Sequence, residues 1–269
     1  MPRHDVDMEL GGHIDELRHR VLISLGSVVL FSTIAFILKE NMIEVIFAPS
    51  KADFIFNRWM FALSERLLQP TLAINQGVLD IVNTKMAGQF NLHLKASIVA
   101  GIVCSMPVIL WQLWAFIKPA ISANVQRRSD WMILQVMLLF FVGLLFGYTF
   151  ISPLAINFLV NYNFSDNITN LIEVPSYLST VINISLAAAF IFQLPHLVFV
   201  LSRIGVLSSA AMKKYRRIAI VIIVTISAII TPPDIFSQVL IAIPFYALYE
   251  CGIVVAQREE RRKSSRREC

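Results

Sequence analysis

The residues best suited to chemistry in this sequence are few, and none of them forms a known enzyme motif. The chain of 269 residues has no G-x-x-x-x-G-K-[ST] phosphate loop, no H-E-x-x-H zinc helix and no G-x-S-x-G nucleophile elbow. Its cysteines, Cys104, Cys251 and Cys269, match neither a C-x-x-C pair nor a structural zinc site. We therefore expect no catalysis, no metal and no cofactor, and ATP-driven pumping and metalloproteolysis lose their support.

Two acidic side chains remain as candidates for binding. Glu16 and Arg20 are four residues apart, so on a helix they share a face and can form an ion pair. The same spacing also fits a solvated amphipathic helix that leads into a membrane span. Glu250 lies within an apolar run, where a carboxylate either faces another helix or a partner subunit, or reaches toward Arg258 at the membrane surface.

Prolines mark the expected ends and kinks of the helices. A proline lacks the N–H group and clashes with the preceding turn, so we expect kinks near Pro107 and Pro195 and a helix end at residues 231–233. Asp234 then stands at the start of the next helix, where a carboxylate is favoured. His196 is expected to hydrogen-bond the carbonyls that Pro195 frees. We assign a structural role to Pro49, Pro107, Pro119, Pro195, Pro232 and Pro233.

These residues are embedded in a sequence with the composition of a membrane protein. Hydrophobic residues make up 57% and charged residues 15%, against about 25% charged in soluble domains. A membrane helix needs about 20 apolar residues to cross about 30 Å of hydrocarbon. The segments that qualify or nearly qualify are 21–38, 96–117, 131–151, 177–201, 218–230 and 239–255. We predict an all-α integral membrane protein with six transmembrane helices.

The distribution of positive charge predicts the orientation of these helices. Of the lysines and arginines, 17 fall on the side of the two termini and six on the opposite side, all six in one long loop. By the positive-inside rule, both termini should face the cytoplasm. The net charge of +5 is then explained by the orientation of the helices in the membrane. We expect the basic tail to contact anionic lipid and not nucleic acid.

We divide the chain into a cytoplasmic amphipathic segment (1–20), a six-helix transmembrane domain (21–256) and a basic cytoplasmic tail (257–269). The transmembrane domain includes a long external loop, residues 39–95. Within this loop, residues 54–68 and 72–90 resemble two weakly amphipathic helices. They either lie on the membrane surface or pack outside it, and the sequence alone leaves both possibilities open.

Four segments resemble the TatC family, the polytopic receptor subunit of the twin-arginine protein translocase. Residues 13–21 (HIDELRHRV) resemble its opening H-x-x-E-L-R-x-R motif. Residues 47–49, 106–119 and 231–238, the last followed by Ala242-Ile243-Pro244, resemble later family segments in the same order. The resemblance covers about residues 10–256, and the loop 50–90 is less typical of the family.

The resemblance implies a function in protein export. The chain would bind precursor proteins whose signal peptides carry consecutive arginines and assemble with single-span TatA- and TatB-type subunits. Folded cargo would then cross the bacterial cytoplasmic (inner) membrane, driven by the proton-motive force. Carboxylates read a planar guanidinium best, through bidentate hydrogen bonds. The implied signal-peptide site comprises Glu16, Arg18, Phe116, Gln126 and Arg127, and the implied intramembrane or partner contacts are Gln193, Asp234, Gln238 and Glu250.

The sequence departs from the family pattern at two of these positions. Gln126 and Gln193 stand where the family commonly has acidic residues. Gln126 keeps an acceptor but loses the charge, and we hypothesise that Asp15 or Asp130 supplies the missing second carboxylate. Gln193 can hydrogen-bond within the membrane but cannot relay a proton.

Two other functional classes remain as alternatives. Six helices, intramembrane prolines and Glu250 also suit a secondary transporter or channel for a small solute. Against that class, the two halves show no repeated pattern and intramembrane charges are almost absent. A non-transporting membrane scaffold would have no need of the Glu16 carboxylate.

Overall fold

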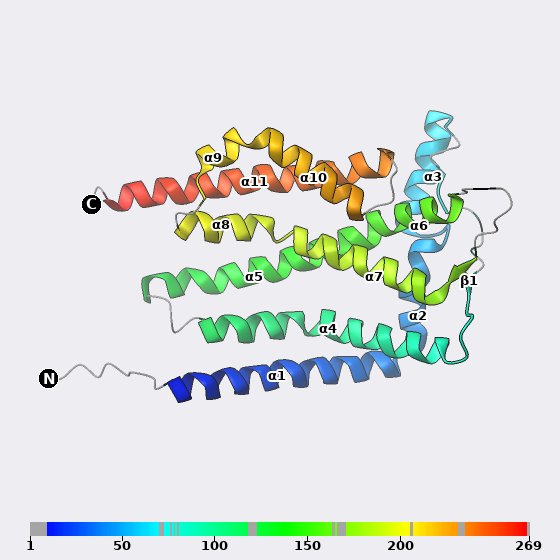
Figure 1. Cartoon of the computed structure of the whole chain (residues 1–269), viewed down its shortest axis with the longest axis horizontal. Coiled ribbons are helices and arrows are strands. Elements are labelled where there is room, and N and C mark those ends of the chain that lie inside the picture. Colours follow the sequence, from blue (N-terminus) through cyan, green and yellow to red (C-terminus); the bar gives the residue numbers. More distant parts are fainter. Residues whose placement is uncertain are drawn as a thin grey trace. The chain divides into compact units, whose positions relative to one another are not determined.

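The computed structural model describes residues 10–69, 73–75, 77, 79, 81–117, 123–162, 165, 171–204, 207–230 and 235–267. Side chains are not described for residues 10–13, 117, 123–132, 203–204, 230, 235–237, 240, 259 and 262–267. The described residues are mostly helical, and the only regular strands among them are two short ones (Figure 1).

The first part of the chain contains α1 (Leu10–Ile37), α2 (Lys39–Phe47), the 3₁₀ turn η1 (Ala48–Ser50), α3 (Ile55–Leu67), β1 (Ile81–Val82) and α4 (Gly88–Ile117). The second part contains α5 (Ala123–Phe146), the π-helical turn η4 (Gly147–Ile151), α6 (Ser152–Asn161), β2 (Ile172–Glu173), α7 (Val174–Ile191), α8 (Leu194–Ile204), α9 (Ser209–Lys214), α10 (Arg216–Ile230) and α11 (Ile235–Arg267). Strands β1 and β2 pair in parallel, with Ile81 opposite Ile172.

Four helical segments among the described residues are long and apolar enough to cross a membrane. They are Ile14–Ile37, Gly88–Phe116, Ile133–Asn161 and Val174–Ser202. The last two each combine two consecutive helices, joined by η4 or by a turn at residues 192–193. Helix α10 has only 15 residues, which at 1.5 Å per residue is about 22 Å. The shortness expected of the fifth segment is therefore confirmed.

Of the two amphipathic helices expected in the long loop, the structure contains only one among the described residues. Helix α3 confirms the amphipathic helix expected over residues 54–68. The second expected helix, over residues 72–90, is wrong: residues 73–75, 77, 79 and 81–87, which the structure describes, contain strand β1 and turns, and helix begins only at Gly88. The pairing of β1 with β2 supplies the backbone hydrogen bonds that a helix would otherwise provide.

Helices α1 and α11 also run through the expected domain divisions. Helix α1 is continuous across residue 20, and α11 is continuous across residue 256. The expected divisions at residues 20 and 256 would therefore mark the boundary between cytoplasm and membrane and not the end of a helix.

The chain divides into two compact units, the first formed by residues 1–43 and 89–137. In this unit α1 and α4 pack antiparallel, since Arg20 contacts Gln112 while the ring of Phe36 stacks on His93 with centroids 4.1 Å apart. The Nε2 atom of His93 is also 3.0 Å from the Phe36 carbonyl oxygen. These contacts fix the register of one helix along the other.

The two helices approach most closely where Gly101 faces Ser32. A Cβ atom built on Gly101 would lie 2.7 Å from the Ser32 Cα and 2.6 Å from its backbone nitrogen. Only glycine allows backbones to come this near, which is a common way to join helices in a membrane. The contact lies between the two register contacts described above.

The second unit consists of residues 44–88 and 138–269. Its main core joins η4, α6, α7, α10 and α11 through the buried residues Ile151, Ala155, Ile184, Ala188, Phe192, Ile223, Ile241 and Phe245. Gly147 brings η4 against α7, because a Cβ atom there would lie 2.8 Å from the Ser185 Cα. Helix α11 packs beside α8 and α10 (Figure 1).

A buried asparagine network joins the loop segments of the second unit. The fully buried Asn57 of α3 donates through Nδ2 to the carbonyls of Pro49 (3.0 Å) and Lys51 (2.8 Å). Asn75 donates through Nδ2 to the Pro153 carbonyl at 2.9 Å, and its backbone N–H donates to Asn157 Oδ1 at 3.1 Å. The network ties η1, α3 and residues 73–75 to α6.

Candidate functional site

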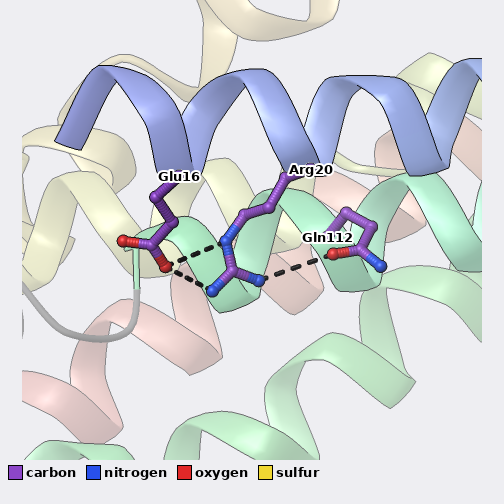
Figure 2. Close-up of polar contacts among 3 residues, drawn as sticks. All are labelled: Glu16, Arg20 and Gln112. Carbon is purple, nitrogen blue, oxygen red and sulfur yellow. Dashed lines mark hydrogen bonds and ion pairs between the residues drawn. The ribbon is translucent and has the colours of Figure 1, made fainter. Parts of the chain in front are cut away.

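Three polar side chains meet between α1 and α4 within the first unit (Figure 2). Arg20 donates from Nε and Nη2 to the same oxygen of Glu16, Oε1, at 3.1 and 2.5 Å. Its third nitrogen, Nη1, is 3.4 Å from Gln112 Oε1 on the facing helix. The expected Glu16–Arg20 pair is therefore present, and a glutamine from α4 is added to it.

The sequence produces this arrangement through helix geometry. Residues four apart lie one above the other on a helix, so α1 aligns Glu16 with Arg20. The antiparallel register then sets Gln112 opposite Arg20. The side chains of Glu16 and Arg20 are only 24% and 22% exposed, which strengthens the attraction compared with a solvated pair.

The same register predicts the neighbour of the carboxylate on α4. Phe116 follows Gln112 by one helical turn in the direction that leads toward Glu16. The Phe116 side chain is partly buried. An acidic and an aromatic group therefore occur at the same level of the helix pair.

The chemistry available here is recognition of a cation. Both bonds from Arg20 go to Oε1, and no described residue donates to the second carboxylate oxygen, Oε2. A carboxylate oxygen can accept more than one hydrogen bond. Glu16 is thus held in place by one guanidinium and keeps an acceptor for another.

The other residues expected at this site are only partly placed. Arg18 and Asp15 are both exposed on α1. Gln126, Arg127 and Asp130 belong to α5, but their side chains lie outside the described residues. The structure therefore links Glu16 to Arg20 and Arg20 to Gln112, while the position of Phe116 near this group follows only from the register of α4 along α1.

The expected intramembrane contacts are spread over the second unit. Gln193 is partly buried in the turn between α7 and α8, and Gln238 of α11 donates to the Val224 carbonyl of α10 at 3.1 Å. Glu250 accepts from Arg216 of α10 at 2.7 Å and from the Tyr246 hydroxyl at 2.8 Å. Its carboxylate thus faces a neighbouring helix. Asp234 lies outside the described residues.

The prolines differ in what they do to the backbone. Pro107 lies inside α4, which continues through it, whereas α7 and α8 are separated by a turn just before Pro195. Pro49 is fully buried in η1 and supplies the carbonyl to Asn57. Pro119, Pro232 and Pro233 lie outside the described residues.

The expectation for His196 is wrong. Its Nδ1 atom is buried and has no hydrogen-bond partner among the described residues, although its backbone N–H bonds the Gln193 carbonyl at 3.0 Å. The backbone N–H groups of residues 192, 193, 196 and 197 donate to the carbonyls of residues 188, 190 and 193, so the turn itself provides these hydrogen bonds.

Sequence reasoning missed several polar side chains that join helices, among them Gln112 and Glu260. Gln112 stands in an apolar run between Trp111 and Trp114, and a polar residue in such a run is a signal that could have found it. Glu260 lies in the basic tail, yet it accepts the backbone N–H of Ser209 at 2.7 Å and the Ser209 hydroxyl. Nothing in its local sequence predicts that contact. Among the described residues, no cluster of three or more His, Cys, Asp or Glu side chains could hold a metal.

Comparisons with known proteins agree over most of the chain. The family model described as "Sec-independent protein translocase protein (TatC)" matches residues 12–244. A protein of that name from Blattabacterium is 31% identical over 254 residues, 93% of this chain and 95% of the relative. One from Aquifex aeolicus is 31% identical over 257 residues, covering 95% and 98%.

Two solved structures resemble the fold. A crystal structure titled as the twin arginine translocase receptor TatC has a TM-score of 0.65 and 29% identity, and covers 92% of this chain and 99% of that one. A second, titled as the same receptor in DDM, has a TM-score of 0.66 and 30% identity, and covers 91% and 99%.

Proposed function

The chain belongs to the TatC family of Sec-independent protein translocase proteins, and from this membership we propose that it is the receptor and core subunit of a twin-arginine translocase. The family consists of membrane transport subunits and not enzymes. In this proposal the chain binds the arginine pair of a signal peptide on a folded precursor. The family match favours this class over the small-solute transporter that the helices alone also allowed.

The Glu16 carboxylate carries the proposal. Its second oxygen receives no bond from a described residue, and Arg20 fixes the orientation of the group from one side. A guanidinium of the ligand would bind this oxygen through short charge-assisted hydrogen bonds. Lysine would serve less well, because an ammonium is a point charge without the planar pair of donors.

The apolar part of a signal peptide would lie next to this carboxylate. Ile14, Leu17 and Val21 form a stripe on α1, with exposures of 64%, 43% and 54%. This stripe is adjacent to the face that carries Glu16 and Arg20. An apolar peptide segment covering it would gain burial while its arginines remain beside the carboxylate.

The surroundings of the site follow from the same proposal. We place six helices across the bacterial inner membrane, including the short α10 and the apolar part of α11, with both termini in the cytoplasm. Gln193, Asp234, Gln238 and Glu250 are then the polar groups available to single-span TatA- and TatB-type partners, and Gln126 and Arg127 would extend the signal-peptide site from α5. Transport would draw on the proton-motive force.

Site-specific photocross-linking in membranes tests the receptor function. A photoreactive residue at Val21, which is exposed beside the site, would be combined with a twin-arginine precursor or with a precursor whose two arginines are lysines. The chain would be wild type, Glu16→Gln, or Glu40→Gln. The last variant removes an exposed carboxylate of α2 and provides the same charge change elsewhere.

We expect strong cross-linking of the twin-arginine precursor to the wild type and to Glu40→Gln. It should be largely lost with Glu16→Gln and with the lysine precursor. Cross-linking that survives both changes, or that is absent in the wild type, overturns the receptor assignment. Uptake of a solute by the chain alone in liposomes would then support the transporter.

A further inference from the structure

Helix α3 packs against a part of the chain that is long and apolar enough to cross the membrane. Its buried face consists of Phe56, Asn57, Met60 and Ser64. The Phe56 ring meets Phe150 edge to face, with centroids 5.2 Å apart, and Met60 shares a buried cluster with Leu154. Phe150 and Leu154 both belong to the candidate span Ile133–Asn161.

The direction of α3 differs from that of the span. In Figure 1, α3 lies steeply across the axis of α6 and not alongside it, and its contacts are with η4 and the first turn of α6. Because α6 forms the last part of the candidate span, a helix that crosses the span there lies close to the plane of the membrane surface. This holds whichever side of the membrane that end faces.

Two charged residues of α3, Arg58 and Glu65, lie on the side opposite its buried face. At 100° per residue they fall within about 20° of each other, and both point away from Met60 and Ser64. Both are exposed; Arg66 is exposed too, but it lies about 80° from Arg58, on the flank of the helix. The side with Arg58 and Glu65 can face water or lipid headgroups.

An exposed apolar stripe occupies the flank between these two faces. It consists of Ile55, Trp59, Leu63 and Leu67, which follow one another at intervals of four residues and are 70%, 73%, 41% and 56% exposed. We call it the α3 stripe. An exposed tryptophan in such a row is unusual for a surface in water, but tryptophan is enriched at membrane interfaces.

We propose that the α3 stripe is embedded in the lipid interface at the end of the span, with phospholipid as its occupant. The level of α3 is set by its packing on Phe150 and Leu154, so its flank meets lipid and its charged side meets the headgroups. Arg58 meets phosphate from the charged side, and Arg66, which lies on the same flank as the stripe at the end of the helix, reaches phosphate by extending its long side chain. This is the geometry of an interfacial amphipathic helix. The inference is independent of signal-peptide binding.

Fluorescence quenching by brominated lipid tests the proposal. The full chain, with Trp111, Trp114 and Trp131 changed to phenylalanine, would be reconstituted in vesicles of phosphatidylethanolamine and phosphatidylglycerol, so that Trp59 is the sole tryptophan. The matched control adds Trp59→Phe and Arg58→Trp, which moves the reporter by one residue to the charged side. Lipids brominated near the glycerol backbone or at the chain end then report depth.

We expect the Trp59 chain to be quenched several-fold more strongly by lipid than the control, and most strongly by the shallow bromine. The control should be quenched more strongly by acrylamide in the water. Equal quenching of the two positions by lipid overturns the proposal. Protection of Trp59 from both quenchers also overturns it, because protein would then cover the stripe.

A second measurement covers the case in which these multiple variants do not fold. A photoreactive residue would be placed at Ile55 or at Arg58 in the otherwise unchanged chain. Cross-linking to phospholipid that is several-fold greater from position 55 supports the proposal. Equal cross-linking from the two positions contradicts it.

Discussion

The carboxylate of Glu250 and the guanidinium of Arg216 join the last two helices, with Oε2 and Nη2 2.7 Å apart. The other oxygen of Glu250 accepts from the Tyr246 hydroxyl at 2.8 Å, so both carboxylate oxygens are used. The sequence left two directions open for this side chain, toward another protein group or toward Arg258. The structure shows the first, with Arg216 of α10 as the partner.

We predict that this ion pair contributes modestly to the stability of the α10–α11 pair. The side chains of Arg216 and Glu250 are 44% and 32% exposed, so each single change, Glu250→Gln or Arg216→Gln, should cost at most about 1 kcal/mol. Thermal unfolding in detergent would measure this, and a double-mutant cycle would isolate the pair. A coupling free energy near zero would show that the contact does not stabilise the fold.

If Glu250→Gln also leaves partner assembly and transport intact, Glu250 is not a partner contact.

Arg20 should act on binding by orienting Glu16. Lysine at position 20 keeps the charge but has no planar fork with which to hold Oε1 from two nitrogens. We predict that Arg20→Lys weakens binding of a twin-arginine signal peptide several-fold, with a smaller loss than Glu16→Gln causes. Arg58→Lys, on the exposed side of α3, is the matched control and should leave the affinity unchanged. Tighter binding by Arg20→Lys would mean that Arg20 competes for the carboxylate.

The close approach of α1 and α4 should tolerate no side chain at Gly101. A Cβ atom there would lie 2.7 Å from the Ser32 Cα, so Gly101→Ala forces the helices apart and should cost about 1–3 kcal/mol. Gly26→Ala is the control, because a Cβ at Gly26 meets nothing within 4 Å. That change should be neutral or stabilise slightly, as alanine favours helix. Thermal unfolding in detergent compares the two, and equal midpoints would contradict the close approach.

The buried asparagine network should be a major source of stability for the segments around α3. Asn57→Ala leaves the carbonyls of Pro49 and Lys51 without their buried donor, which should cost about 1–3 kcal/mol. Asn91→Ala, at an exposed position of α4, should stay within about 0.5 kcal/mol. Limited proteolysis of residues 44–88 reports the same difference locally. Unchanged protease resistance in Asn57→Ala would show that the network is dispensable.

Much of the local structure was predictable because it depends on neighbours in the chain. The apolar runs predicted the helices of all four candidate spans. The short run at residues 218–230 predicted a helix too short to cross an unperturbed bilayer. The i,i+4 spacing of Glu16 and Arg20 predicted their pair. Composition and ordered motifs also indicated the family that the comparisons then identified.

Two local expectations failed because they depended on the surrounding fold. Residues 72–90 carry a weak helical pattern, but Ile81 and Val82 pair as β1 with β2, some 90 residues later in the chain, and this pairing uses their backbone groups. His196 was expected to hydrogen-bond carbonyls freed by Pro195, but its buried Nδ1 atom has no partner among the described residues. The direction of a buried side chain is set by the packing around it and not by its neighbours in the sequence.

The family, the helical membrane character and the presence of Glu16 in the first helix could all be established without a structure, because hydrophobic length, helix period and motif order are properties of the chain. The groups that face Glu16 and Glu250 could be identified only in the folded protein. Gln112 reaches Arg20, and Arg216 reaches Glu250, through helix registers fixed by close backbone approach and side-chain packing. Such a register depends on how two helix surfaces fit each other, whereas a periodic pattern of apolar residues describes each surface separately.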